Sequence, residues 1–146
     1  MTIHRFVLCV FALVPFTLVS CDSGPTLAEV EGTLTLKGKP LDKIQVEFWP
    51  EGNGPRSMGT TDAQGRFTLM TDDGKRKGAV VGWHKIVLKD VGVLGDTFLG
   101  RKGEDVDMTK GKKPQVSDAY SDPHKSSVRK EVTTGKCVIE IDLTSQ

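Results

Sequence analysis

The sequence predicts an all-β fold, a seven-stranded antiparallel β-sandwich that follows an N-terminal signal segment. Three observations support this prediction. Short stretches alternate apolar and polar residues with the period of two that a half-buried strand requires. Turns that contain glycine or proline separate these stretches, and no segment of useful length has the i, i+3, i+4 apolar spacing of a helix. Such a series is typical of two sheets whose alternate side chains form one core.

The first residues have the pattern of an export signal. Met1–Arg5 carries one positive charge, and the apolar stretch Phe6–Leu18 is shorter than the roughly 20 residues that span a bilayer. It ends at Leu18-Val19-Ser20-Cys21, which resembles the bacterial lipobox. By this resemblance, residues 1–20 are a lipoprotein signal peptide, and Cys21 becomes the first residue and carries acyl chains on its sulfur and its amine. Two or three chains suffice for stable anchoring, so we expect a protein on the bacterial membrane, facing the periplasm or the cell surface.

The alternative is an ordinary secretory signal in which Cys21 has no special role. If Cys21 is acylated and Cys9 is removed with the signal, Cys137 has no partner, and we expect no intrachain disulfide. Residues 21–28 have no periodicity and are predicted to be a tether. The remaining residues, 29–146, are predicted to form a single domain.

Alternation predicts seven strands in this domain, and the last of them is the most regular. There Cys137, Ile139, Ile141 and Leu143 share one face. The predicted strands are Val30–Lys37, Ile44–Trp49, Ser57–Thr61, Arg66–Thr71, Trp83–Leu88, Val128–Val132 and Cys137–Leu143. Most of the connections are short and polar. In the turn from Asp62 to Gly65, the aspartate is expected to accept backbone N–H bonds and the glycine to adopt a positive φ.

One segment, Asp90–Ser127, does not fit the strand pattern. It is long, charged and rich in glycine, and it carries apolar islands at 91–95 and at Phe98-Leu99. Connections longer than about 12–15 residues are usually functional or disordered. The sequence therefore predicts a long irregular insertion at this point.

Charge and composition exclude several functions. The chain has 20 basic and 19 acidic residues, and loss of Arg5 with the signal makes the two numbers equal. We therefore expect no nucleic-acid binding, which needs a clustered basic surface. The candidate metal ligands His84, His124 and Cys137 match no known spacing, so no metal site and no cofactor are expected. We interpret His84 as a partly buried ring bonded to a backbone carbonyl, and Cys137 as a small core residue.

Five motifs between Val30 and Asp90 resemble those of the carboxypeptidase-regulatory-like, or transthyretin-like, β-sandwich family. They are Val30-Glu31-Gly32-Thr33-Leu34, Gly38-Lys39-Pro40-Leu41, Val46-Glu47-Phe48, Thr61-Asp62-Ala63-Gln64-Gly65-Arg66-Phe67 and Gly82-Trp83-His84-Lys85-Ile86. The tail, with Tyr120-Ser121-Asp122-Pro123 and Gly135-Lys136-Cys137, is similar to a subgroup of small bacterial lipoproteins. Two positions depart from the pattern, since His84 stands where the family often has Tyr, and Cys137 where the subgroup often has Asn.

The resemblance implies a non-catalytic binding or scaffold module, because such domains are accessory units. Enzymes of the transthyretin fold need residues that this chain lacks. Hydroxyisourate hydrolases use a C-terminal Tyr-Arg-Gly-Ser, whereas this sequence ends Leu143-Thr144-Ser145-Gln146, and intradiol dioxygenases use two tyrosines where this chain has one. A small-ligand carrier of transthyretin type and, less favoured, a hydrolase are the alternatives.

The candidate interaction surface consists of aromatic and apolar residues outside the predicted core pattern. Trp49 and Trp83 lie opposite the inward-facing positions of their strands, and Phe98, Leu99 and Tyr120 belong to the long insertion. We expect them to contact an envelope protein or a glycan. The alternative is that the two tryptophans only cover a sheet edge or pack beneath the insertion. The oligomeric state stays open.

Overall fold

The protein is described by a computed structural model covering residues 24–94 and 113–144, and its elements are mostly strands. The strands are β1 (Leu27–Leu36), β2 (Lys39–Pro40), β3 (Ile44–Pro50), β4 (Ser57–Thr60), β5 (Arg66–Thr68), β6 (Met70–Thr71), β7 (Ala79–Val80), β8 (Gly82–Asp90), β9 (Arg129–Val132) and β10 (Lys136–Leu143). A four-residue helix, α1 (Val91–Leu94), and a 3-10 turn, η2 (Asp118–Tyr120), are the helical elements of these residues. The predicted all-β character is confirmed.

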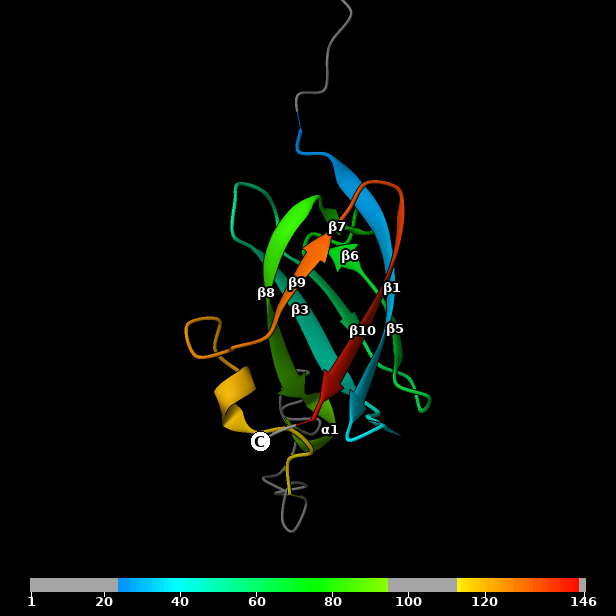
Figure 1. Cartoon of the computed structure of the whole chain (residues 1–146), viewed down its shortest axis with the longest axis vertical. Helices are drawn as coiled ribbons and strands as arrows, with labels where there is room; N and C mark the ends of the chain where they lie inside the picture. The colour runs from blue at the N-terminus through cyan, green and yellow to red at the C-terminus, as the bar shows by residue number, and fades with distance from the viewer. Residues whose placement is uncertain (1–23, 95–112, 145–146) are drawn as a thin grey trace, which may run out of the picture.

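The strands form two five-stranded sheets (Figure 1). In the first sheet, β1 pairs with β10 on one edge and with β7, β5 and β2 in succession on the other. The second sheet has the order β6-β4-β3-β8-β9. The prediction of antiparallel pairing is wrong for one pair, because β1 and β10 run parallel, from Glu29 opposite Lys136 to Leu36 opposite Leu143. The other strand pairs among the described residues are antiparallel.

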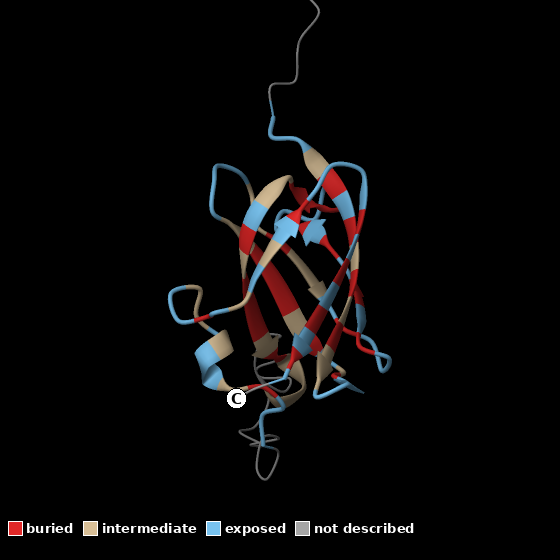
Figure 2. Ribbon diagram, viewed as in Figure 1, coloured by how far each residue is buried: buried red, intermediate tan, exposed pale blue. Residues whose placement is uncertain are grey.

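One hydrophobic core draws side chains from both sheets, and buried and exposed positions alternate along β10 (Figure 2). Phe48 of β3 joins the two sheets, since its ring centroid lies 6.3 Å from that of Phe67 in β5. The first sheet contributes Val30, Leu34, Ile139 and Ile141, the second contributes Ile44, Val46, Ile86, Leu88 and Val132, and Leu69 joins them from between β5 and β6. Cys137 is buried in this core with a free thiol, which confirms its expected role as a small core residue.

The predicted count of seven strands differs from the ten that the structure contains. Each predicted stretch holds a strand, but Arg66–Thr71 is divided into β5 and β6 at Leu69. The additional strands β2 and β7 are only two residues long. Alternation needs several residues to be visible, so strands this short leave no signal in the sequence.

The predicted tether is two residues too long, because β1 begins at Leu27. Leu27 pairs with Val80 and Ala28 with Ala79, and Ala28 is buried. The tether was predicted too long because strand β7, which pairs with the first residues of β1, leaves no pattern in the sequence.

Close packing around Gly32 shows why β1 carries a glycine in its inward-facing row. A Cβ atom at this position would overlap the Phe67 ring and the Ile139 carbonyl oxygen. The absent side chain lets Phe67 lie directly against the β1 backbone.

The two described ends of the long insertion meet at one carboxylate. Asp90 is buried at the end of β8 and accepts hydrogen bonds from Gly92 N at 3.0 Å and from Gln115 N at 2.8 Å. The Gln115 side chain also reaches Asp90, at 3.3 Å, and the Asp42 carbonyl oxygen, at 3.0 Å. The insertion therefore leaves and rejoins the domain at the same place. Its described part also contains α1 and η2, where an irregular segment was predicted.

Candidate interaction surface

The outward side of the second sheet brings the two predicted tryptophans together. Trp49 lies opposite Lys85 across β3 and β8, and Trp83 is two residues before Lys85, so the three side chains share one face. We call this side the tryptophan face. By register, its members include Gln45, Glu47 and Trp49 of β3, Met58 and Thr60 of β4, Trp83, Lys85, Val87 and Lys89 of β8, and Arg129 and Glu131 of β9, with Arg56 beside them.

A buried carboxylate, that of Glu47, lies at the centre of the tryptophan face. Glu47 is 3% exposed, and its Oε1 accepts hydrogen bonds from Lys89 Nζ at 2.7 Å and from Gln45 Nε2 at 3.2 Å. Its Oε2 accepts from Trp49 Nε1 at 2.9 Å and lies 3.9 Å from an Arg56 nitrogen. A buried charge is tolerated only when it is paired and hydrogen-bonded, and these partners meet that requirement.

The Trp49 indole is held both at its edge and on its face. Glu47 binds the indole N–H, and the Arg56 guanidinium lies 4.5 Å from the ring centroid. Arg56 also lies 3.5 Å from Asp72. The ring is therefore fixed in place by a cation–π contact and a charge-assisted hydrogen bond.

Trp83 has a matching arrangement but is far more open to solvent, with 46% of its surface exposed. The Arg129 guanidinium lies 4.8 Å from its ring centroid and donates to both Glu51 oxygens, at 2.7 Å and 2.6 Å. The hydrogen bond from Arg129 lowers the pKa of Glu51, and the same bond raises the pKa of Arg129. Each tryptophan is thus capped on one side by an arginine that a carboxylate holds.

The residue types of this arrangement are those of binding surfaces. Trp and Arg are the residues most enriched at binding hot spots, and rigid aromatic rings lose little entropy on contact. Lys85 lies between the two arginine–tryptophan stacks, opposite Trp49 on one side and Arg129 on the other. Within the described ranges, no group of three or more His, Cys, Asp and Glu side chains could hold a metal ion.

The other predicted surface residues do not join this face. Tyr120 belongs to η2 and packs partly buried against the core, while residues 116–118 of the same segment meet Leu88–Asp90, at the opposite end of β8 from Trp83. The guanidinium groups that cover the two tryptophans come from Arg56 and Arg129, which lie outside the insertion. Most of the insertion that the alternative would place over them, residues 95–112, lies outside the described residues. Phe98 and Leu99 lie outside the described residues, as do Leu18, Val19, Ser20 and Cys21.

The sequence did not predict the charged partners of the tryptophans. Glu47 carries a weak signal, because an acidic residue stands two positions before Trp49 on the same strand face. Arg56 and Arg129 carry none, since each meets its tryptophan through strand pairing that the sequence does not show.

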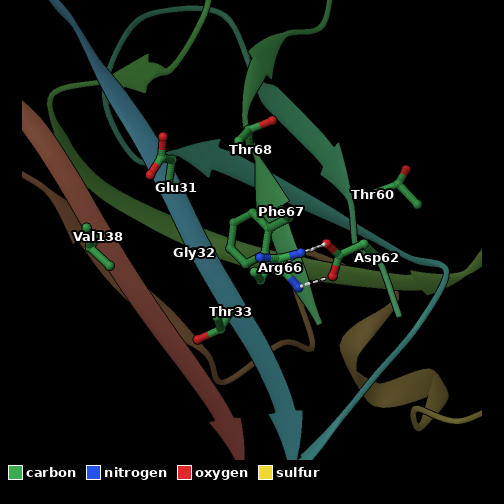
Figure 3. Close-up of a pocket in the computed structure, with 9 residues that line it drawn as sticks. All are labelled: Glu31, Gly32, Thr33, Thr60, Asp62, Arg66, Phe67, Thr68 and Val138. Carbon is green, nitrogen blue, oxygen red and sulfur yellow. Dashed lines mark hydrogen bonds and ion pairs between the residues drawn. The ribbon is translucent and has the colours of Figure 1, made fainter. Parts of the chain in front are cut away.

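A second candidate site is an open groove of about 440 Å³ on the outward side of the first sheet (Figure 3). Its floor is Gly32 of β1 and Phe67 of β5, and Val138, which is 71% exposed, forms one wall. Asp62 and Arg66 form an ion pair at 3.0 Å on the other side. Asp62 also accepts the expected turn bonds, and the one from the Arg66 backbone is the main reason that its pKa is lowered.

His84 faces inward from β8 and bonds a backbone carbonyl as predicted, but it is fully buried where a partly buried ring was expected. It is 1% exposed, its Nδ1 lies 3.0 Å from the Gly82 carbonyl oxygen, and its ring packs on Phe48 with centroids 5.6 Å apart. Its Nε2 is buried without a hydrogen-bond partner in the described structure. Burial is the largest cause that lowers the pKa of His84, so the ring is neutral at pH 7.

The chain matches no protein-family model, no curated protein and no solved structure. Among the described residues, no helix has the length and apolar character needed to cross a membrane.

Replacing Glu47 tests the centre of the tryptophan face. Glu47→Ala removes the acceptor of Trp49, Gln45 and Lys89, so we expect the free energy of unfolding to fall by about 1–3 kcal/mol and the Trp49 emission to change. Urea unfolding followed by fluorescence measures both effects. Glu131→Ala, at an exposed position on the same face, is the matched control and should change neither quantity. Equal behaviour of the two variants would show that the Glu47 contacts contribute nothing.

The neutral His84 predicts a loss of stability in acid. Because its folded-state pKa lies below the unfolded value of about 6.5, the unfolded chain binds a proton first, and stability falls as the pH drops below about 6.5. The slope for this one group is at most about 1.4 kcal/mol per pH unit. Urea unfolding between pH 7.5 and 5, at half-unit steps, measures it. His84→Phe, which keeps an aromatic ring beside Phe48, should flatten the profile.

His124→Asn is the matched control for this profile, since the His84 ring is intact in that variant. The slope should persist there. An unchanged slope in His84→Phe would assign the acid sensitivity to another group.

Proposed function

We propose that the protein is a lipid-anchored module of the bacterial cell envelope that acts through binding or scaffolding and not through catalysis. The lipobox-like Leu18-Val19-Ser20-Cys21 supports the anchor. The two sheets around one core, together with the family motifs, support a β-sandwich of the carboxypeptidase-regulatory-like or transthyretin-like type. In this proposal the membrane is one partner, through the acyl chains, and an envelope protein or glycan is the second.

The observation that carries the proposal is the preformed tryptophan face. Its tryptophans are fixed by arginines, and those arginines by carboxylates, so little conformational entropy is lost when a partner binds. One face of each indole is already covered by a guanidinium, which leaves less room for a sugar ring to stack. We therefore favour a protein partner over a glycan.

A small-ligand carrier is the second candidate, and the groove of Figure 3 is the observation that favours it. Its volume falls in the range of roughly 300–1,000 Å³ that small-molecule sites occupy. Its charged groups already bind each other, however, since Asp62 pairs with Arg66 and Glu31 pairs with Lys136 at 3.1 Å. A ligand would meet mainly threonine side chains and Val138, so this candidate ranks second.

Replacing the proposed acylation site tests the anchor. In wild-type cells we expect the mature protein in the membrane fraction, with an intact mass that includes acyl chains on Cys21. Cys21→Ser removes the sulfur that carries lipid, and the protein should then leave the membrane fraction. Cys9→Ser, in the predicted signal, is the control and should retain both the lipid and the location. Retention of Cys21→Ser in the membrane would contradict the anchor.

A photo-crosslinking residue in place of Lys85 tests the tryptophan face in the same cells. Lys85 lies between Trp49 and Arg129, so a partner seated on this face should be captured there as a discrete adduct identified by mass spectrometry. The control places the same crosslinker at Val138, which is exposed on the first sheet. The adduct should be missing there. Capture at Val138 but not at Lys85 would move the binding surface to the groove.

A further inference from the structure

The chain enters the domain at one end, and the described residues show where. The Thr26 carbonyl oxygen accepts a hydrogen bond from Val81 N at 2.9 Å. Pro25 lies beside Gly54 and Val80, since a Cβ atom built on Gly54 would be 3.5 Å from Pro25 Cγ and 2.7 Å from Val80 Cγ2. The entry point is therefore next to the loop of residues 51–56 and the start of β8.

A pocket of about 370 Å³ opens at this same end. Pro50, Val80, Val81 and the Trp83 indole provide its apolar lining, and Asn53 lies at its exposed loop. We call it the entry pocket. Val80 pairs with Leu27 and Val81 donates to Thr26, so the pocket is directly beside the entering chain.

The length of chain before Pro25 limits which part of the domain can meet the membrane. Four residue steps separate Cys21 from Pro25, and they span at most about 14 Å. Strand β1 starts beside the entry point at Leu27 and ends at Leu36, a distance of about 30 Å at 3.3 Å per residue. An anchor on Cys21 therefore holds the entry pocket near the bilayer and leaves the turn after Leu36 far from it.

We propose that the entry pocket and the Trp83 indole rest on the phospholipid headgroup layer of the membrane that holds Cys21. This inference rests on the proposed acylation of Cys21. An indole is apolar in body and polar at its N–H, which is why tryptophan is enriched at the level of the headgroups. Trp83 is the exposed aromatic of the pocket, and Arg129 beside it places a cation within reach of lipid phosphates.

Most charged side chains near the entry pocket are paired with each other, so we expect a bilayer contact that does not depend on anionic lipid. Arg129 is paired with Glu51, and Arg56 is paired with Asp72. The hairpin after Asp72 adds three basic residues, Lys75, Arg76 and Lys77, against Asp73, since Asp72 is already paired with Arg56. Its place at this end follows from the bond between Asp72 N and the Arg56 carbonyl oxygen, at 2.9 Å. The bilayer contact therefore uses mainly the apolar pocket and the indole, and Trp49 with Lys85 stays available for a protein partner.

The test measures how close each end of the domain lies to lipid. Full-length protein is purified from membranes and reconstituted in phosphatidylcholine vesicles whose acyl chains carry bromine near the headgroups, which quenches nearby tryptophans. In Trp49→Phe, Trp83 is the one remaining tryptophan, and we expect it to lose most of its emission. The matched control is Trp49→Phe/Trp83→Phe/Lys39→Trp, whose reporter lies in exposed β2 beside Leu36 and should keep its emission.

A second reporter keeps the test independent of Trp83 itself. Asn53→Trp, in the Trp49→Phe/Trp83→Phe background, places an indole at the entry pocket and should be quenched as Trp83 is. Equal quenching of the pocket and Lys39→Trp reporters, or no quenching at either end, would overturn the docking. Shielding of Trp83 from a water-soluble quencher without bromine quenching would also overturn the docking, because a second copy of this chain, and not lipid, would then cover the indole.

Intact mass separates failure of this inference from failure of the proposed function. Acylated protein whose pocket reporters are not quenched overturns the docking alone and leaves the anchor intact. Protein that carries no acyl chain on Cys21 overturns both.

Discussion

The pairing of β1 is the constraint on which the rest of the domain depends. On one edge, β1 holds β10 in parallel register, and on the other it holds β7, β5 and β2, none longer than three residues. Strands this short cannot persist alone, because a few ladder bonds do not offset the loss of backbone entropy. β1 therefore orders the first sheet and, through it, one wall of the core. It also sets the distance between the end where the chain enters and the opposite end.

The outward sides of the two sheets differ in how their charged residues are paired and buried. On the first sheet, the charged groups beside the groove, such as Asp62 and Arg66, bind one another near the surface. On the second sheet, Glu47 is buried although it points away from the core, and its partners come from β3, β8 and the loop that carries Arg56. A carboxylate in that position must keep its hydrogen bonds to be tolerated, so it restricts how the side chains around it can pack. The rigidity of the tryptophan face follows from this requirement.

Much of the fold could be predicted from the sequence, because long half-buried strands leave a pattern with a period of two. That pattern located β3, β8 and β10 within two residues at each end, and it assigned Trp83 to the outward side. It could not show β2 or β7, which are too short, nor the parallel pairing of β1 with β10, which depends on contacts far apart in the chain. The tryptophans of the candidate site were predictable from the same alternation. Their arginine caps were not, because residues distant in sequence are brought to them only by the folded sheet.

The meeting of Gly92 and Gln115 at the Asp90 carboxylate has a consequence for how this domain can change over time. Because the two ends of this connection lie next to each other, its length can change without any shift of the two sheets. Each doubling of a flexible loop adds only about 0.6 kcal/mol of closure entropy. Residues can therefore be inserted at this junction with little loss of folding free energy, and the strand registers of the two sheets stay the same.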